Sequence, residues 1–369
     1  MIPFQNFSES FLVEKNKELN IIEDVLSSGQ LILGKYIDSF EEDWGAYTGA
    51  NECVSVANGL DALVLALRGL GIGPGSRVAV PANTFIATWL AVSAVKATIV
   101  PVDPDPVTYN TEVECYEALL EGGEKIDAII PVHLYGRPID MDAMSSLCHR
   151  YNIKCIEDAA QAHGATVHGK KIGAHSDAVC WSFYPGKNLG GIGDGGAITT
   201  NNKVLAEYLR KLRNYGSSQK YHNEFAGINS RLDAVNAAVL SSRINRLDTE
   251  NFKRQRNADI YLENIVNDNV VVPAKSIEFL SVWHQFVLQV DDRYHFQKYM
   301  EDNGISTMVH YPIPPYRQQA YADHGFHQYE YPITNYISDR IVSLPVNPFL
   351  SESNTLKISN IVNSYEVKK

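Results

Sequence analysis

The sequence predicts an α/β protein built around a mainly parallel sheet, and three observations support that prediction. Short apolar or β-branched runs alternate with stretches of helical period through the first two-thirds of the chain. The stretches between the predicted strands are long enough to be crossover helices, which parallel strands require. Beyond about residue 164 this alternation gives way to a different order of turns, strands and longer helices.

The first half of the chain supplies the parallel strands and their crossover helices. Each apolar run is followed by a segment whose apolar positions repeat with helical period. We expect strands over 52–57, 77–81, 98–103, 127–133 and 154–158, and helices over 60–70, 85–96, 111–121 and 140–151.

The second half predicts further strands of this sheet and then a smaller α+β unit. The expected elements are a turn at HGKKIG, strands over 177–183, 197–200 and 285–291, helices over 202–214, 231–266, 295–303 and 353–366, and a proline-bearing loop over 310–316. We therefore expect a large domain over residues 1–250, which includes an N-terminal helical segment, and a smaller C-terminal domain over 251–369. A long helix, rather than a flexible linker, is expected to join them.

Composition excludes several classes of function. The chain has 369 residues with 43 acidic and 32 basic side chains, a net charge of −11, so we expect neither nucleic acid nor a membrane surface as a partner. Its five cysteines never occur in C-x-x-C spacing, which argues against a disulfide framework or a cysteine-based zinc site, and we expect no metal. No signal segment or membrane-spanning apolar run occurs, so we expect a cytoplasmic protein.

Two glycine patterns look like nucleotide-binding motifs but lack the required context. GIGDGG (191–196) fits G-x-G-x-x-G, yet it leads into a predicted strand, whereas the dinucleotide fingerprint leads into a helix. GATVHGKK (164–171) has P-loop spacing, but Lys171 stands where a Ser or Thr would hold Mg²⁺. We interpret both matches as accidental.

Two clusters of polar groups follow predicted strands. In ANGLDAL (57–63) a strand ends and a helix begins, so the amides of Gly59 and Leu60 are placed to bind a phosphate. In KCIEDAAQAHG (154–164) two carboxylates, Gln161 and His163 lie at the carboxyl end of a strand, where α/β sheets bind ligands. A solvated loop with a helix cap is an equally weighted interpretation of this second cluster.

A third cluster, SFYPGKNLGGIGDGG (182–196), places Ser182 and Lys187 five residues apart on a strand-end turn. Six of the eleven residues from 186 to 196 are glycine, which we interpret as allowing the backbone to approach something bulky. Together the three clusters supply a phosphate cradle, a carboxylate and a lysine near a hydroxyl. Pyridoxal 5′-phosphate (PLP) needs this set: the lysine forms a Schiff base, a carboxylate pairs with the pyridine nitrogen, and an aromatic ring such as Phe85 covers the ring face.

The motifs then show a specific resemblance. ANGLDAL, PANTF, HLYGRPIDMDA, IEDAAQAHGA, SFYPGKNLGG and GINSRLDAVNAAVL resemble, in this order, the DegT/DnrJ/EryC1/StrS family of nucleotide-sugar aminotransferases. The resemblance implies the PLP-dependent transferase fold of the aspartate aminotransferase type (fold type I). It also implies a mixed, mainly parallel seven-stranded sheet between helices, and a homodimer with active sites at the subunit interface.

The resemblance also assigns roles to individual positions. Lys187 matches the Schiff-base lysine; the related 3-dehydratases carry His there. The implied cofactor-binding residues are Gly59, Leu60 and Ser182 for the phosphate, Phe85 and Gln161 for the ring, Asp158 for its nitrogen, and Asn229 for the phosphate of the other subunit. Candidate sugar and diphosphate contacts are His163, Tyr184, Tyr215, Tyr221 and His310, chosen because hydroxyls and imidazoles suit polyols.

The implied reaction is ping-pong transamination with L-glutamate as donor. The region from NYGSSQKYHNEF (214–225) through HYPIPPY (310–316) is most like members that act on dTDP-3-keto-6-deoxyhexoses, which implies a dTDP-3-amino-3,6-dideoxyhexose product for O-antigen or S-layer glycans. Three alternatives stay open: a 4-keto-sugar aminotransferase using a UDP- or dTDP-sugar, a non-catalytic PLP-binding regulator, and an oxidoreductase built on GIGDGG.

Overall fold

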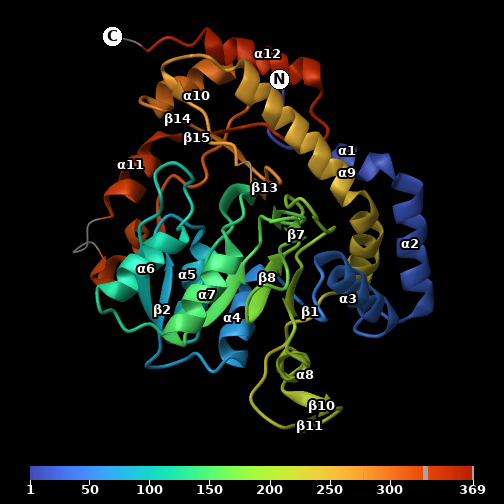
Figure 1. Cartoon of the computed structure of the whole chain (residues 1–369). Helices are drawn as coiled ribbons and strands as arrows, with labels where there is room; N and C mark the ends of the chain where they lie inside the picture. The colour runs from blue at the N-terminus through green and yellow to red at the C-terminus, as the bar shows by residue number, and fades with distance from the viewer. Residues whose placement is uncertain (277, 327–330, 368–369) are drawn as a thin grey trace.

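A seven-stranded mixed sheet forms the centre of the molecule (Figure 1). The computed structural model describes residues 1–276, 278–326 and 331–367. The strand order is β1-β9-β8-β5-β4-β2-β3, and only β9 runs antiparallel to its neighbours. The strands are β1 (Glu52–Val56), β2 (Arg77–Pro81), β3 (Thr98–Val102), β4 (Ala128–Ile129), β5 (Lys154–Asp158), β8 (Ala178–Ser182) and β9 (Gly196–Thr200). The predicted α/β class is confirmed.

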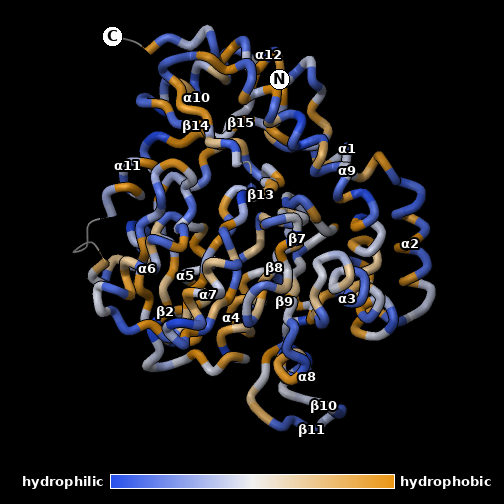
Figure 2. Tube along the Cα trace, in the orientation of Figure 1, coloured by the Kyte–Doolittle hydropathy of each residue, from blue (hydrophilic) through white to orange (hydrophobic). Residues whose placement is uncertain are grey.

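Helices cover both faces of this sheet and create two hydrophobic cores. The crossover helices are α4 (Gly59–Gly69), α5 (Ile86–Ala94), α6 (Val113–Glu121), α7 (Met141–Tyr151) and α8 (Lys203–Leu212). One core contains side chains of α4, α5 and α8, such as Trp89 and Leu209, and the other contains side chains of α6 and α7, such as Tyr116 and Met144. Figure 2 shows the hydrophobic segments gathered around this layered centre.

The N-terminal helices pack beside the longest helix of the described chain. The N-terminal helices are α1 (Phe7–Val13), α2 (Lys15–Ser28) and α3 (Lys35–Thr48), and α9 extends over Ala234–Asn264. Both α2 and α3 pack against α9. This helix passes through residue 250: Leu247 belongs to the core of the central sheet, whereas Tyr261 belongs to a third core in the C-terminal part. The expected long joining helix is thus present, while the division between residues 250 and 251 stays a prediction.

The C-terminal part is a small antiparallel sheet with helices, in the order β12-β14-β15. Its elements are β12 (Val270–Val271), β14 (Phe286–Val290), β15 (Ile341–Leu344), α10 (Arg293–Asp302), α11 (Pro332–Arg340) and α12 (Glu352–Asn363). A tyrosine of this part also contacts the part built around the central sheet, since Tyr321 packs edge-on against Trp89 of α5. The two parts therefore share a packed contact as well as α9.

Several element boundaries differ from the sequence prediction. The strand expected over 127–133 is only two residues long as β4, because Pro131 has no N–H to continue the ladder. The expected turn at HGKKIG lies in a hairpin of β6 (Thr166–Val167) and β7 (Lys170–Lys171), which pairs with β13 (Phe279–Leu280). A further hairpin, β10 (Ser217–Gln219) and β11 (His222–Asn223), has no counterpart in the prediction.

The structure also bears on two composition arguments. None of the helices in the described ranges combines the length and apolarity needed to cross a bilayer. All five cysteines are free thiols, and only Cys115 is more than slightly accessible.

The two glycine patterns do not form nucleotide-binding loops. GIGDGG leads into β9 rather than a helix, and GATVHGKK forms the β6–β7 hairpin.

A buried ion pair connects the N-terminal helices to the sheet and to α8. The Glu41 carboxylate on α3 accepts hydrogen bonds from the Ser55 amide (2.9 Å) and hydroxyl (2.8 Å) on β1, and from Arg213 after α8. Glu41 and Arg213 are both more than nine-tenths buried. Removal of one partner would leave the other charge without compensation in the interior.

We therefore expect Glu41→Ala to destabilise the fold by about 3–5 kcal/mol, because Arg213 would remain buried without its partner. Glu42→Ala, one residue along the same helix on an exposed face, is the matched control. Thermal denaturation of both variants checks this expectation. Equal melting temperatures for the two variants would show that this ion pair does not connect the layers.

Candidate active site

A cavity of about 490 Å³ lies at the carboxyl ends of the central strands, against the C-terminal part. Residues that follow β1, β2, β5 and β8 line it, because the ends of the parallel strands meet at the same edge of the sheet. Nine of the thirteen predicted site residues meet in its wall: Gly59, Leu60, Phe85, Asp158, Gln161, Ser182, Tyr184, Lys187 and His310.

Lys187 lies in the loop after β8, and its amine faces this cavity. Shielding from solvent lowers the pKa of this amine to about 8, while the Asp158 carboxylate opposes that change. The backbone amide of Lys187 donates to the carbonyl of Tyr184 (2.8 Å), which fixes the turn that carries the side chain. Within the described part of the chain, the amine itself makes no hydrogen bond or ion pair, so it is free to react.

Asp158 ends β5 and is held by two hydrogen-bond donors. Its Oδ2 accepts from the Thr88 hydroxyl (2.9 Å) on α5, and its Oδ1 accepts from the Ala160 amide (3.2 Å). Burial raises the pKa of this carboxyl, while these donors and Lys187 act in the opposite direction. A buried carboxylate fixed in this way can pair with a protonated ring nitrogen.

The neighbouring carboxylate, Glu157, serves the fold instead. Its oxygens lie 2.9 Å from His133 Nε2 and 2.7 Å from the Ser176 hydroxyl, and both Glu157 and His133 are fully buried. The Ile139 amide donates to His133 Nδ1 (3.1 Å), so Nε2 carries the hydrogen that bonds to Glu157. Alternation along β5 thus separates a structural acid from the acid that faces the cavity.

The start of α4 forms an anion-binding end beside Ser182. The Asn58 side chain accepts from the Asp61 amide (2.8 Å), and the first intrahelical bond runs from the Ala62 amide to the Asn58 carbonyl (3.1 Å), so the amides of Gly59 and Leu60 have no partner within the helix. Asn58 is therefore the N-cap of α4. A Cβ on Gly59 would lie 2.7 Å from the Ser182 Cβ, so only glycine lets the helix end approach that hydroxyl residue.

Gln161 and Phe85 lie on either side of a tyrosine that the sequence analysis did not single out. Gln161 Oε1 accepts from the Tyr135 amide (2.6 Å), and its Nε2 donates to the Tyr311 hydroxyl (3.0 Å). The rings of Tyr311 and Phe85 lie 5.1 Å apart at 42°. Half of the Phe85 surface stays exposed, so this ring is available to stack on a planar ligand.

His310 and Tyr184 lie on the side of the cavity near the C-terminal part. His310 Nδ1 lies 2.8 Å from the Ser343 hydroxyl on β15, and its backbone carbonyl accepts from the Tyr135 hydroxyl. Burial and the charge of Lys187 lower the pKa of His310 to about 4, so the imidazole is neutral at physiological pH. The Tyr184 side chain is exposed and adds a hydroxyl to the same wall.

Four predicted site residues do not line the cavity of this single chain. His163 is fully buried among Trp44, Trp181 and Phe183, which gives it a packing role and leaves no surface for a sugar contact. Tyr215, Tyr221 and Asn229 are exposed on or beside the β10–β11 hairpin, which projects from the body of the molecule near α8 (Figure 1). Their roles stay predictions that depend on a second subunit.

The glycine-rich loop approaches the protein itself rather than a bulky ligand. Added Cβ atoms at Gly190, Gly191 and Gly196 would lie 2.2–2.4 Å from atoms of Pro185, Asn236 and Asn58. Our interpretation that these glycines admit a ligand is wrong for these three positions. They allow the loop to fold tightly against α9 and the start of α4, which positions Lys187.

The structure adds residues that sequence reasoning missed. These are Gln5, Thr84, His284, Gln285, Met308 and Tyr311 in the cavity wall, with Thr88 behind Asp158. Thr88 lies three residues after Phe85, just beyond the PANTF motif, and Tyr311 follows His310. Closeness in the sequence to residues already identified was therefore the signal that could have revealed them. Gln5 carries no such signal, because only the tertiary fold brings the N-terminus to this site.

The chemical groups that line this cavity fit pyridoxal phosphate. Free helix-terminal amides and a hydroxyl suit a phosphate, a fixed carboxylate suits a pyridinium nitrogen, an uncovered ring suits a stacked pyridine, and a shielded amine suits an aldehyde. All of them face the same cavity, which has the size of a cofactor site.

Comparison with known proteins finds similar sequences among aminotransferases. The family model described as the DegT/DnrJ/EryC1/StrS aminotransferase family matches residues 13–363. The chain is 46% identical over 365 residues, 99% of both chains, to the dTDP-3-amino-3,6-dideoxy-α-D-galactopyranose transaminase of Aneurinibacillus thermoaerophilus.

Two solved structures share the fold at appreciable sequence identity. S. venezuelae DesV in complex with a ketimine intermediate is 41% identical, with a TM-score of 0.95 and coverage of 98% and 97% of the two chains. NtdA from Bacillus subtilis with bound cofactor PMP is 30% identical, with a TM-score of 0.88 and coverage of 95% and 81%. The fold type and the PLP cofactor are thereby confirmed, and the chain belongs to the DegT/DnrJ/EryC1/StrS aminotransferase family.

Proposed function

We propose that this aminotransferase converts a dTDP-3-keto-6-deoxyhexose to a dTDP-3-amino-3,6-dideoxyhexose with L-glutamate as the amino donor. The observation that carries the proposal is the meeting of Lys187, Asp158 and the α4 N-terminus in one cavity. The name of the similar Aneurinibacillus transaminase supports the choice of sugar. When bound, PLP links to an amine through its aldehyde and acts as an electron sink for the carbon that loses a proton.

Lys187 is the proposed proton carrier for both half-reactions. Its amine must be neutral to take a proton from the Cα of the donor, and protonated to return one to the sugar carbon. A pKa of about 8 raises the neutral fraction at pH 7 from about 0.03% to about 10% relative to an ordinary lysine. Asp158 keeps the pKa from falling further, so the same group can act as base and then as acid.

The remaining cavity residues bind and orient. The Gly59 and Leu60 amides and the Ser182 hydroxyl hold the phosphate in our proposal, and Phe85 and Gln161 fix the ring plane and its hydroxyl edge. Tyr184 and the neutral His310 are proposed to hydrogen-bond sugar hydroxyls. A neutral imidazole suits this role, because it can donate or accept without a charge that a sugar ring cannot compensate.

We propose a homodimer that completes each site. The predicted contacts on the projecting hairpin, Tyr215 and Tyr221, and the nearby Asn229 lie outside the cavity of their own chain. Phe85 and Tyr184 in turn leave about half of their surface uncovered. Closure of the cavity by Asn229 of the partner subunit and by its hairpin would account for both observations.

We further propose a cytoplasmic enzyme that supplies amino sugars to O-antigen or S-layer glycans.

The alternatives receive less support. A UDP- or dTDP-4-keto sugar would need the ketone one carbon away from the position that the similar 3-amino-sugar transaminase acts on. A purely regulatory PLP-binding role would need Lys187 only to hold the cofactor, and it would not account for an amine whose pKa of about 8 suits proton transfer. An oxidoreductase on GIGDGG is excluded, because that loop leads into β9.

Gly59→Ala should weaken cofactor binding, because its new Cβ would lie 2.7 Å from Ser182 and push the α4 amides away from the phosphate site. We expect the dissociation constant for PLP to rise roughly tenfold or more, which corresponds to the loss of one good hydrogen bond to a charged group. Titration of the apoprotein with PLP measures this. Gly73→Ala is the control, since its Cβ would meet nothing closer than 3.8 Å; equal affinities in the two variants would contradict the assignment.

The rate of the glutamate half-reaction should rise with pH through a midpoint near 8 and level off above about pH 9. Once glutamate has displaced it from the cofactor, Lys187 acts as the base only in its neutral form, and the lowered pKa of its free amine sets the midpoint. Rapid-mixing measurements of the visible absorbance change on adding glutamate, over pH 6–10, test this. His310 has already lost its proton throughout this range, so it contributes no second step. A midpoint near 10.5, or a rate that falls as pH rises, would argue against Lys187 as the base.

The substrate itself is tested by product analysis. Holoenzyme with L-glutamate should aminate a dTDP-3-keto-6-deoxyhexose with kcat/KM at least about 100-fold above that for a dTDP- or UDP-4-keto sugar, because a misplaced ketone loses alignment with Lys187. Mass spectrometry and NMR of the amino sugar give the position of the new amine. Exclusive turnover of a 4-keto sugar would overturn the proposed regiochemistry while leaving the transaminase assignment intact.

A further inference from the structure

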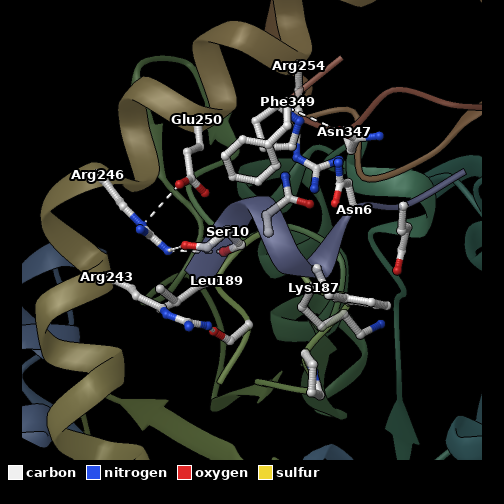
Figure 3. Close-up of a pocket in the computed structure, with 17 residues that line it drawn as sticks. Asn6, Ser10, Lys187, Leu189, Arg243, Arg246, Glu250, Arg254, Asn347 and Phe349 are labelled. Atoms are coloured by element: carbon white, nitrogen blue, oxygen red, sulfur yellow. Dashed lines mark hydrogen bonds and ion pairs between the residues drawn. The ribbon is translucent and has the colours of Figure 1, made fainter. Parts of the chain in front are cut away.

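A second, smaller cavity of about 50 Å³ lies on the other side of the Lys187 loop (Figure 3). Its walls come from the N-terminal segment before and within α1, the loop 185–190, one face of α9 and the loop 347–349. In Figure 3, Arg254 points down from α9 toward the side of this cavity where Asn6 and Lys187 lie. Nothing in the proposed reaction uses this space.

Three arginines from α9 line the cavity, and two of them are paired. Arg243 binds Glu18 through two hydrogen bonds of 2.7 and 2.8 Å. Arg246 pairs with Glu250 at 3.0 Å. Arg254 is only 8% exposed, yet it has neither a hydrogen bond nor an ion pair with any residue that the structure describes.

Arg254 therefore brings an uncompensated positive charge into a confined space. Burial lowers the pKa of its guanidinium to about 10, so it still carries its proton at neutral pH. Glu250 attracts it at longer range, but Oε1 of Glu250 pairs with Arg246 (3.0 Å). Buried charges in proteins are normally paired, because an isolated one loses hydration that no other contact replaces.

We propose that this cavity binds one small monovalent anion, a halide or a carboxylate of formate size, on the guanidinium of Arg254. The volume excludes a nucleotide or an amino acid, and a guanidinium offers a fork of donors that suits such an anion. Asn6 and Ser10 come from the N-terminal segment, so the bound anion connects this segment to α9 behind the Lys187 loop. The site does not depend on the identity of the sugar.

A halide titration tests the site without reference to turnover. Holoenzyme in halide-free buffer receives sodium bromide, with sodium gluconate, too large for the cavity, keeping the ionic strength constant. We expect a saturable rise in melting temperature of about 2 °C or more in the wild type. The rise should be absent in Arg254→Met and present in Arg256→Met, which removes an exposed arginine on the same helix that pairs with Glu352. A parallel titration with formate distinguishes the two anion types.

Crystals grown in bromide provide a readout that needs no variant. Anomalous scattering should place a bromide ion within hydrogen-bond distance of the Arg254 guanidinium. Water alone in this cavity, or an equal bromide response in the wild type and Arg254→Met, would overturn the proposal. Neither result would affect the transaminase assignment, because the assay measures binding and not amino transfer.

Discussion

Desolvation of a single lysine amine is the constraint on which the rest of this active site depends. An ordinary lysine is almost entirely protonated at neutral pH and is a poor base. In this protein, shielding lowers the pKa of Lys187 to about 8, and the Asp158 carboxylate limits the decrease. The same carboxylate is the proposed partner of the cofactor's ring nitrogen, so in this proposal one acid serves both the lysine and the cofactor.

The fold creates this arrangement through the edge of the sheet. Parallel strands place the residues after β1, β2, β5 and β8 side by side, so the proposed phosphate site and stacking ring converge with an acid and an amine without long-range loops. The glycine-rich loop then folds against Asn236 and Asn58, which holds the amine in place. The C-terminal part adds the opposite wall with His310 and Tyr311, and α9 runs through both parts.

The sequence predicts much of this because local patterns mark strand ends. Lys187, Asp158 and Gly59 each follow a clear apolar run, so their meeting follows from the topology alone. Residues whose place depends on tertiary folding are different: Gln5 reaches the cavity from the N-terminus, and His284 from the strand region of the C-terminal part. His163 is the opposite case, since its position in a strand-end motif looks functional although aromatic rings enclose it.

Chemical rescue tests the central role of the Lys187 amine most directly. In Lys187→Ala with bound PLP, small primary amines added from solution can take the place of the missing base. We predict negligible amino transfer without an added amine, and rescued rates that increase with the basicity of amines of equal size, because proton transfer follows a Brønsted relation. Substantial transfer by Lys187→Ala without any added amine, or rescue that is independent of amine basicity, would contradict this account.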